Sequence, residues 1–396
     1  MNAPDKDRAV VFDALRERIA GRTEPMLEDL RELVDINSYT SNKAGGDRVA
    51  EILAARASAL GLEARRIASE KFADHWVLST KRAAHSAEGA VVLVGHIDTV
   101  FPPGSFEGFR RDGALVRGPG VLDMKGGIVI MLEALRALSA VDSLDNVQAR
   151  IVLVGDEEVG SPEGRGVIQR ETAGAKSALV FEAGRAADKI ITSRKGTGSG
   201  RAIAIGKAAH AANGHKDGVN AIWALAKFID KAQSLTDYAR GVTVNVGVIQ
   251  GGEAKNTVPD RCECQLDFRF ERISDADATY AALKQFASEA AAAVAGSSIE
   301  LSGGPGRMPL ERTDANLAVY RAYAEHARAA GLGGDEAPLI AGGSDASSTA
   351  AIGIPSIDGL GPRGSGFHTK DELIEVASLE PKVEALARYL WDFARG

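Results

Sequence analysis

The sequence predicts an α/β fold with a mostly parallel sheet, interrupted by a smaller α+β unit. In the first half of the chain, short apolar runs alternate with helical stretches, which is typical of parallel strands joined by crossover helices. From about Thr192 the order becomes strand, helix, strand, strand, helix and strand, as in a ferredoxin-like βαββαβ unit. The first pattern resumes after Met308. We therefore expect a discontinuous α/β domain, residues 1–191 and 305–396, and an inserted domain, residues 192–304.

The α/β domain is expected to begin with two amphipathic helices, at residues 10–36 and 46–60, because apolar residues recur there at helical spacing. Ser161 and Pro162 resemble a helix start, with serine as the N-cap and proline in the first helical position. The other elements of this half are expected as strands at 76–78, 90–94, 150–154 and 177–181 and helices at 126–138 and 162–172.

In the inserted domain we expect strands at 200–205, 242–249, 261–270 and 299–301, and helices at 219–233 and 275–294. The last segment should contain a helix at 314–330, strands near 338–340 and at 355–357, and a closing helix at 379–393. Cys262 and Cys264 lie two residues apart in one strand and share a face without the geometry of a disulfide, so both are expected to be reduced.

Composition argues against several classes of protein. Hydrophobic residues make up 45% of the 396 residues, the net charge is -7, and no basic block is present, which argues against nucleic acid as a partner. The longest apolar runs are far shorter than the roughly 20 residues that span a bilayer. Charged Asp13, Arg16 and Glu17 stand where a signal peptide would need an apolar core, so a cytoplasmic location is expected. With two cysteines, any zinc site must use histidines and carboxylates.

Polar side chains follow several of the predicted strands. His96 and Asp98 end one strand on a shared face, where a carboxylate could orient a metal-binding imidazole; an ordinary strand-end histidine is the alternative. Asp123 lies in a Gly-rich loop before a helix, and could instead be an N-cap. The acidic residues 156–158 follow another strand, and a solvated loop is their alternative.

Glu182 follows a further strand, and His368 lies in a Gly-rich loop near the C-terminus. Together the chain offers two imidazoles and three carboxylates, which is an inventory for two metal ions: His96, Asp123, Glu158, Glu182 and His368. The charge of two divalent ions balances that of the three carboxylates and a bridging hydroxide.

With these motifs the sequence resembles peptidase family M20 of dizinc carboxypeptidases and deacylases, and within it the glutamate carboxypeptidase (carboxypeptidase G2) group. The order and spacing match over nearly the whole chain, at residues 95–98, 118–127, 156–161, 181–182, 209–211, 256–259, 342–345 and 367–368. The resemblance implies a zinc-hydrolase catalytic domain and an inserted lid and dimerisation domain.

Carried over by position, the resemblance implies that Asp123 bridges two metal ions. His96 and Glu182 would complete one site, and Glu158 and His368 the other. It also implies that Glu157 is the general base, that Asp98 orients His96, and that the peptide bond after Asp123 is cis.

In the inserted domain, the resemblance implies that His210 reaches the partner subunit's active site and that Asn256, Arg269 and Gly343 bind substrate. A surface ion pair is the alternative for Arg269. Residues 211–217 depart from the family pattern, because they lack its proline and add His215. That departure bears on the lid and the substrate rather than on the metal site.

The expected activity is hydrolysis of the amide bond of a small N-acyl amino acid or short peptide, with release of an amino acid such as glutamate. The enzyme would be a homodimer with two divalent ions, expected to be zinc, with cobalt or manganese as alternatives. The alternative enzymatic functions are those of a deacetylase or desuccinylase of the same family, or of an aminopeptidase. A non-catalytic peptide-binding relative would be expected to have lost a ligand or the base, and this chain keeps them all.

Overall fold

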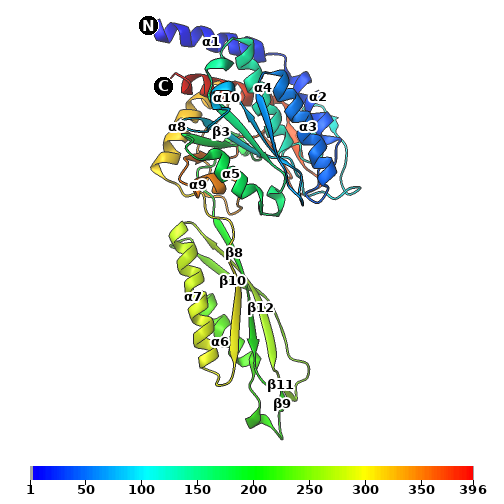
Figure 1. The fold of residues 1–396 in the computed structure, drawn as a ribbon, viewed down its shortest axis with the longest axis vertical. Coiled ribbons are helices and arrows are strands. Elements are labelled where there is room, and N and C mark those ends of the chain that lie inside the picture. Colours follow the sequence, from blue (N-terminus) through cyan, green and yellow to red (C-terminus); the bar gives the residue numbers. More distant parts are fainter. Residues whose placement is uncertain (1–2, 396) are drawn as a thin grey trace. The chain divides into compact units, whose positions relative to one another are not determined.

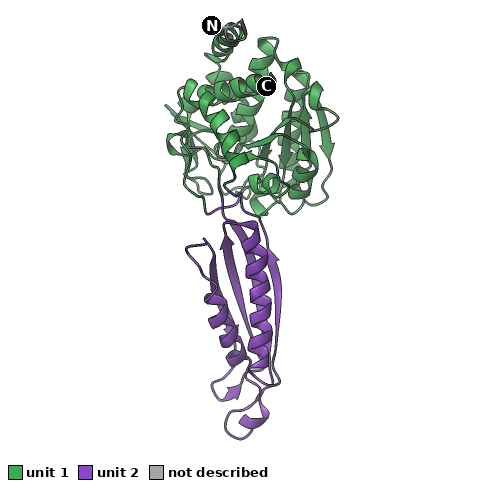
Figure 2. Ribbon diagram, turned by 90° about the vertical axis from the view of Figure 1, so that its left-hand side faces the viewer, with its two compact units in different colours: residues 1–193, 312–340, 344–396 green, residues 194–311, 341–343 purple. Residues whose placement is uncertain are grey.

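The computed structural model describes residues 3–395, which form two compact units (Figure 2). Unit 1 comprises Met1–Ser193, Arg312–Ile340 and Ser344–Gly396, and unit 2 comprises Arg194–Glu311 and Ala341–Gly343. Unit 2 thus continues past residue 304, because Leu310 and Arg194 form an antiparallel bridge beyond the last strand.

A six-stranded sheet forms the centre of unit 1 (Figure 1). Its order is β1 (Glu63–Ile67), β2 (His75–Ser79), β6 (Ala149–Val154), β3 (Val91–His96), β7 (Ser177–Val180) and β14 (Ser356–Ile357). Strands β6, β3, β7 and β14 are parallel, whereas β2 pairs antiparallel with both of its neighbours. The predicted mostly parallel sheet is confirmed.

Two crossover helices determine where this sheet can hold a ligand. Helix α4 (Lys125–Ala140) connects β3 to β6, and α5 (Gly164–Thr172) leads back from β6 to β7 on the other side of β3. The chain moves across the sheet in one direction from β3 to β6 and in the opposite direction from β6 to β7. Because such connections are right-handed, this reversal puts α4 and α5 on opposite faces of the sheet. The carboxyl ends of β6, β3 and β7 meet at this reversal, which is where open α/β sheets bind ligands.

The remaining helices of unit 1 enclose its core. They are α1 (Ala3–Ile19), α2 (Thr23–Val34), α3 (Lys43–Ala59), α8 (Asp314–Ala329), α9 (Ala346–Ala350) and α10 (Leu379–Phe393). Helix α4 is buried continuously over its first eleven residues, from Lys125 to Leu135, and packs against α10 and α2. Its apolar residues occur on all sides, as expected for a helix inside the core.

A small second sheet in unit 1 was not expected from the sequence. It has the order β15 (Gly364–Ser365), β16 (Leu373–Glu375), β5 (Leu115–Arg117) and β4 (Arg110–Asp112). These strands are two or three residues long, too short for an alternating pattern to predict them. Their pairing brings the segment before residue 118 beside the turn at 366–372.

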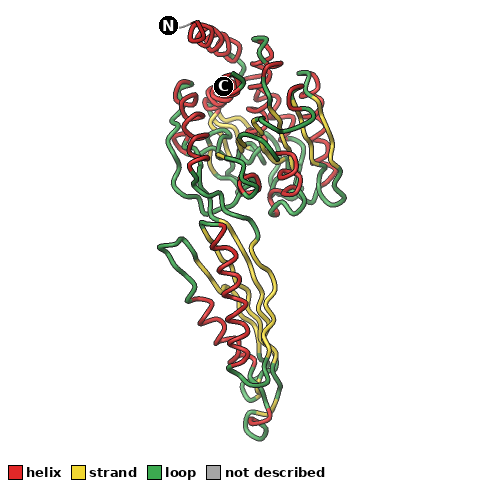
Figure 3. The backbone as a smooth tube through the Cα atoms, turned by 60° about the vertical axis from the view of Figure 1, so that its left-hand side comes forward, coloured by secondary structure: helices red, strands yellow, loops and turns green. Residues whose placement is uncertain are grey.

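Unit 2 has a four-stranded antiparallel sheet in the order β10 (Thr243–Gly251), β12 (Arg261–Phe270), β8 (Gly196–Ile205) and β13 (Ser298–Pro305). This order confirms the ferredoxin-like arrangement. Helices α6 (Ala221–Gln233) and α7 (Ile273–Ala292) lie on one side of the sheet (Figure 3). The core between them includes Cys262 and Cys264, which are buried and free, as predicted. Short β9 (Ala209–His210) and β11 (Thr257–Val258) pair separately.

Three local predictions were wrong. The helix expected at 10–36 is two helices, α1 and α2, separated at Gly21, which has a left-handed φ of 78°. Ser161 does not cap α5, because its hydroxyl donates to Asp345. No strand forms at 338–340; Glu336 forms an isolated bridge with Ile190, and Ile340 is a single bridge residue whose N–H donates to the main-chain oxygen of Ser193 at 3.2 Å.

No helix within residues 3–395 combines the length and the apolar content that crossing a membrane requires.

The break at Gly21 yields a stability prediction. Alanine at this position would adopt a left-handed backbone, so Gly21→Ala should lower the free energy of unfolding by about 1–2 kcal/mol. Gly166, inside α5, has no such φ and no neighbour closer than 3.6 Å to an added Cβ. Gly166→Ala should therefore raise the free energy of unfolding by about 0.4–1 kcal/mol. Urea denaturation of both variants measures the difference, and equal transition midpoints would contradict the left-handed break.

Candidate metal centre

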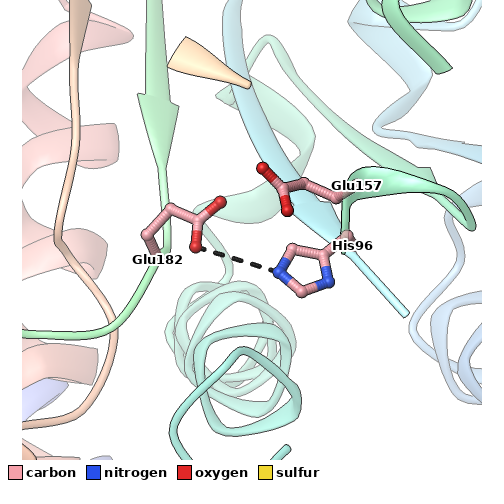
Figure 4. Close-up of side chains that lie close together, drawn as sticks. All are labelled: His96, Glu157 and Glu182. Atoms are coloured by element: carbon pink, nitrogen blue, oxygen red, sulfur yellow. Dashed lines mark ion pairs between the residues drawn. The ribbon is translucent and has the colours of Figure 1, made fainter. Parts of the chain in front are cut away.

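His96 ends β3 inside unit 1 with its two ring nitrogens in different environments. Nδ1 lies 3.0 Å from the main-chain oxygen of Asp98, which therefore accepts its proton, while Nε2 lies 3.3 Å from Oδ1 of Asp123 and 3.8 Å from Oε2 of Glu182. Figure 4 shows the imidazole facing Glu182, with Glu157 close by. With Nδ1 bonded to the main chain, Nε2 is the nitrogen that faces the carboxylates, which is the position from which a histidine can bind a metal ion once that nitrogen has lost its proton.

The carboxylate of Asp98 holds the neighbouring acidic loop. It accepts hydrogen bonds from the main-chain N–H groups of Glu157 and Glu158, each at 3.2 Å, and from the hydroxyl of Thr40 at 2.7 Å. Asp98 Oδ1 also lies 3.4 Å from Nδ1 of His96. One buried carboxylate thus fixes the end of β3 and the segment that follows β6.

The three acidic residues after β6 point in different directions. Asp156 is fully buried and accepts from the N–H groups of Glu163 and Gly164, so it supplies the helix-start contact predicted for Ser161. Glu158 is only 4% exposed in its side chain and lies 3.0 Å from Nε2 of His368. The solvated-loop alternative is therefore wrong for this segment.

Asp123 lies between the two histidines. Its Oδ1 is 3.3 Å from Nε2 of His96, and its Oδ2 is 3.3 Å from Nε2 of His368. The Asp123–Met124 peptide bond is cis, as predicted. The N-cap alternative for Asp123 is wrong, because Met124 occupies the N-cap position of α4 and no side chain there makes a capping bond.

Burial and charge compete in this cluster. Burial raises the pKa of Glu182 to about 7, helped by the charge of Asp123. Burial likewise raises the pKa of Glu158. Hydrogen bonds with Asp123 and Glu158 raise the pKa of His368 to about 10. Burial opposes the charge on His96, but its three carboxylate neighbours still hold its pKa well above the ordinary value. The carboxylates thus need positive charge beside them.

The donor set fits metal ions. Within residues 3–395, two overlapping groups offer ligand atoms that all lie within 4.8 Å of one another: His96, Glu157 and Glu182, and His96, Asp123 and Glu158. Oε1 of Glu182 is buried and finds no hydrogen-bond partner among the described residues. Imidazole nitrogens and carboxylate oxygens are ligands of zinc and related divalent ions. Bound cations would contact Oε1 of Glu182 and offset the negative charge of the clustered carboxylates.

The other sequence-predicted site residues belong to unit 2. His210 is exposed at the end of β9, and its Nδ1 accepts from the N–H groups of Ala212 and Asn213 at 3.1 and 3.2 Å. Asn256 is also exposed. Arg269 is paired with Asp267 at 2.8 Å, which is the surface ion pair considered as its alternative. Gly343 lies in the segment Ala341–Gly343.

Sequence reasoning missed two buried side chains at the centre. Thr40 anchors Asp98, and Glu372 accepts three main-chain N–H groups from the loop that carries Asp123. Both depend on contacts between distant segments. A glutamate four residues after His368 has no local feature that distinguishes it from a surface residue.

Comparison with known proteins agrees with this geometry. Residues 92–392 match the model of "Peptidase family M20/M25/M40". Carboxypeptidase G2 from Pseudomonas sp. (strain RS-16) is 27% identical, over 94% of this chain and 90% of the relative. Succinyl-diaminopimelate desuccinylase from Acidovorax ebreus is 27% identical, over 90% of this chain and 95% of the relative.

Among solved structures, aminopeptidase PepT from Bacillus cereus has a TM-score of 0.79 at 23% identity, covering 94% of this chain and 99% of the other; this likeness shows the fold. The matched family model spans most of the strands and all the proposed ligands. The chain therefore belongs to peptidase family M20/M25/M40 and is a hydrolase that acts on amide or peptide bonds.

Proposed function

We propose that this chain is a two-metal hydrolase that removes the C-terminal amino acid of a short peptide or the acyl group of a small N-acyl amino acid. The observation that carries this proposal is the single carboxylate of Asp123 between the imidazoles of His96 and His368. With further carboxylates on both sides, that arrangement suits a pair of ions bridged by one aspartate.

In this proposal His96 and Glu182 would hold one ion, Glu158 and His368 would hold the other, and Asp123 would contact both. Bound divalent ions would polarise the substrate carbonyl and lower the pKa of a water molecule. Zinc is the expected ion, because imidazole and carboxylate ligands suit it, with cobalt or manganese as alternatives.

Glu157 is assigned as the general base. Its main chain is fixed by Asp98, and its carboxylate lies beside His96 and Glu182 (Figure 4). From there it would take the proton of the attacking water and pass it to the leaving amine. Asp98 would keep the base and His96 at a fixed distance.

His210 is assigned to the carbonyl oxygen of the substrate. Because Nδ1 of His210 accepts two main-chain N–H bonds, its proton is on Nε2, which is then an outward-facing donor. A donor of this kind can stabilise the oxyanion that forms during amide hydrolysis. We propose that the partner subunit's His210 supplies it within a homodimer.

The homodimer is supported by the surface of unit 2. Large apolar side chains are exposed on α6 and on edge strand β10, where a second copy could cover them: Ile222, Trp223, Val248 and Ile249. An open edge strand beside an apolar surface is a common place for subunits to pair.

The substrate is proposed to carry a free carboxylate, bound by Arg269 and Gly343 of one chain and by Asn256 of the partner subunit, because Asn256 lies beside His210 and the length of β12 separates it from Arg269. Arg269 and Asp267 are 37% and 47% exposed, so exchanging this ion pair for a substrate carboxylate would cost little. Glutamate is the first leaving amino acid to test, because carboxypeptidase G2 is a relative. A desuccinylase relative keeps a deacylase as the second candidate. A cytoplasmic location stays a prediction.

Screening N-acyl amino acids and dipeptides for amine release, with zinc, cobalt and manganese in turn, tests the substrate class. We expect substrates with a free carboxylate beside the cleaved amide to be hydrolysed and their carboxamides to be resistant. Equal cleavage of acids and carboxamides would contradict the proposed carboxylate recognition.

Metal content tests the two-ion assignment. Protein reconstituted with zinc and freed of excess metal should contain two ions per chain by elemental analysis, because Asp123 lies between two histidines that each have a further carboxylate beside them. His368→Ala should lose at least one ion, whereas the exposed His85→Ala should keep both. One ion or fewer in the unmodified chain would contradict the assignment.

Substitution of Glu157 tests whether this residue is a general base or a metal ligand. Glu157→Gln should keep its metal and lose about 100- to 10,000-fold in turnover, the range typical when a general base is removed. Glu163→Gln, in the same loop and 40% exposed, should behave as unmodified protein. If Glu157→Gln loses metal instead, Glu157 is a ligand.

Subunit exchange tests whether His210 acts across the dimer. His210→Ala and Glu157→Gln should each be nearly inactive, but mixing them should restore turnover. Each mixed dimer then has one site with an intact Glu157 and an intact partner histidine. The doubly substituted chain serves as control, because mixing it with either variant restores no site. Exchange verified by mass without recovery would show that His210 works within its own chain, and a monomer in solution would end the proposal.

A further inference from the structure

Glu372 is a buried carboxylate whose two oxygens accept hydrogen bonds from main-chain N–H groups. Its Oε1 accepts from the N–H groups of Leu122 at 2.9 Å and Asp123 at 3.0 Å, and its Oε2 accepts from Gly120 at 3.1 Å. The residue is 0% exposed. Three buried donors of one loop therefore depend on a single side chain.

The loop that Glu372 binds is the one that carries Asp123. It runs from β5 to α4 and turns at Gly118 and Gly120, whose φ angles are 156° and 79°. Leu122 and Asp123 are both buried, so water cannot replace the acceptor that Glu372 supplies. A buried N–H group left without a partner would destabilise the loop that carries it.

Glu372 also belongs to the turn that carries His368. Its N–H donates to the main-chain oxygen of Thr369 at 3.2 Å, and Thr369 donates back to Gly366. His368 has a left-handed φ of 62°, a conformation that the surrounding turn must impose. The side chain of Glu372 therefore joins the turn of one proposed ligand to the loop of another.

Lys125 holds the loop from its other end. Its ammonium group is fully buried and donates to the main-chain oxygens of Leu33 and Ile36 at the end of α2. Its own N–H donates to Gly120 at 2.8 Å. Glu372 and Lys125 thus hold the loop on both sides of Asp123, so protein contacts define the position of Asp123 without a metal ion.

We propose that Glu372 is a positioning residue that holds the carboxylate of Asp123 in register with His368 before metal binds, and thereby sets the metal affinity of the centre. This inference rests on the proposed role of Asp123 and His368 as ligands. It assigns no contact between Glu372 and metal or substrate.

The test uses Glu372→Gln, which keeps the size of the side chain but replaces one acceptor oxygen with an amide that cannot accept. Zinc affinity is measured on the full-length apoprotein by competition with a chelator, without any substrate. Loss of a group that orients a metal ligand typically weakens metal binding about 10- to 100-fold, and we expect a change of that size.

Asp371→Asn is the matched control. Asp371 is the exposed neighbour of Glu372, and replacing it removes the same charge without touching the loop at 118–123. It should bind zinc as the unmodified chain does. An equal loss in this control would show that charge alone is responsible and would overturn the proposal.

Thermal unfolding of the apoproteins separates positioning from stability. If Glu372→Gln folds and has a lower unfolding temperature but the same zinc affinity as the unmodified chain, the role of Glu372 is structural only and the proposal is overturned. If that variant does not fold, Glu372→Asp replaces it; its carboxylate is one methylene further back and should weaken zinc binding too. Unchanged zinc binding by Glu372→Asp would also overturn the proposal. Because no substrate is used, failure of the proposed amide hydrolysis leaves this result unaffected.

Discussion

Mutual repulsion among buried carboxylates is the constraint that the catalytic unit has to meet. Asp123, Glu158 and Glu182 come together with two imidazoles in an interior where like charges interact strongly. Burial raises the pKa values of Glu158 and Glu182, and the charge of Asp123 adds to that effect. Besides the contacts of these carboxylates with His96 and His368, the unit keeps the groups close by anchoring the main chain that carries them, and the carboxylate oxygens face a shared centre.

Two carboxylates that are not themselves proposed ligands perform most of this anchoring. Asp98 accepts from the main chain of Glu157 and Glu158, and Glu372 accepts from that of Asp123. Each joins segments that are distant in sequence, and each is buried. A main-chain hydrogen bond fixes the direction in which a side chain leaves the backbone, which is why these contacts control ligand geometry without touching the ligand atoms.

The sequence allowed prediction of the parts of the site that depend on local pattern. His96 ends one apolar strand and Glu182 closely follows another, and parallel strands bring such ends to one edge. By contrast, Thr40 and Glu372 act through partners 58 and about 250 residues away, and no periodicity reports such a contact. The same reason explains the error at Ser161: a fully buried Asp156 from the preceding strand end makes the contact that a local capping rule assigns to serine.

The two units divide the chemistry of the chain. All the proposed ligands and the proposed base lie in unit 1, where the sheet, α4 and the small sheet around Glu372 fix their positions. The residues proposed to meet the substrate lie in unit 2, mostly on exposed or half-exposed surface, where substitution disturbs little packing. Substrate preference can then change without any change in the metal ligands. Two relatives that are each 27% identical to this chain are named for different reactions, one as a carboxypeptidase and one as a desuccinylase. Such a division of the chemistry would produce relatives of this kind.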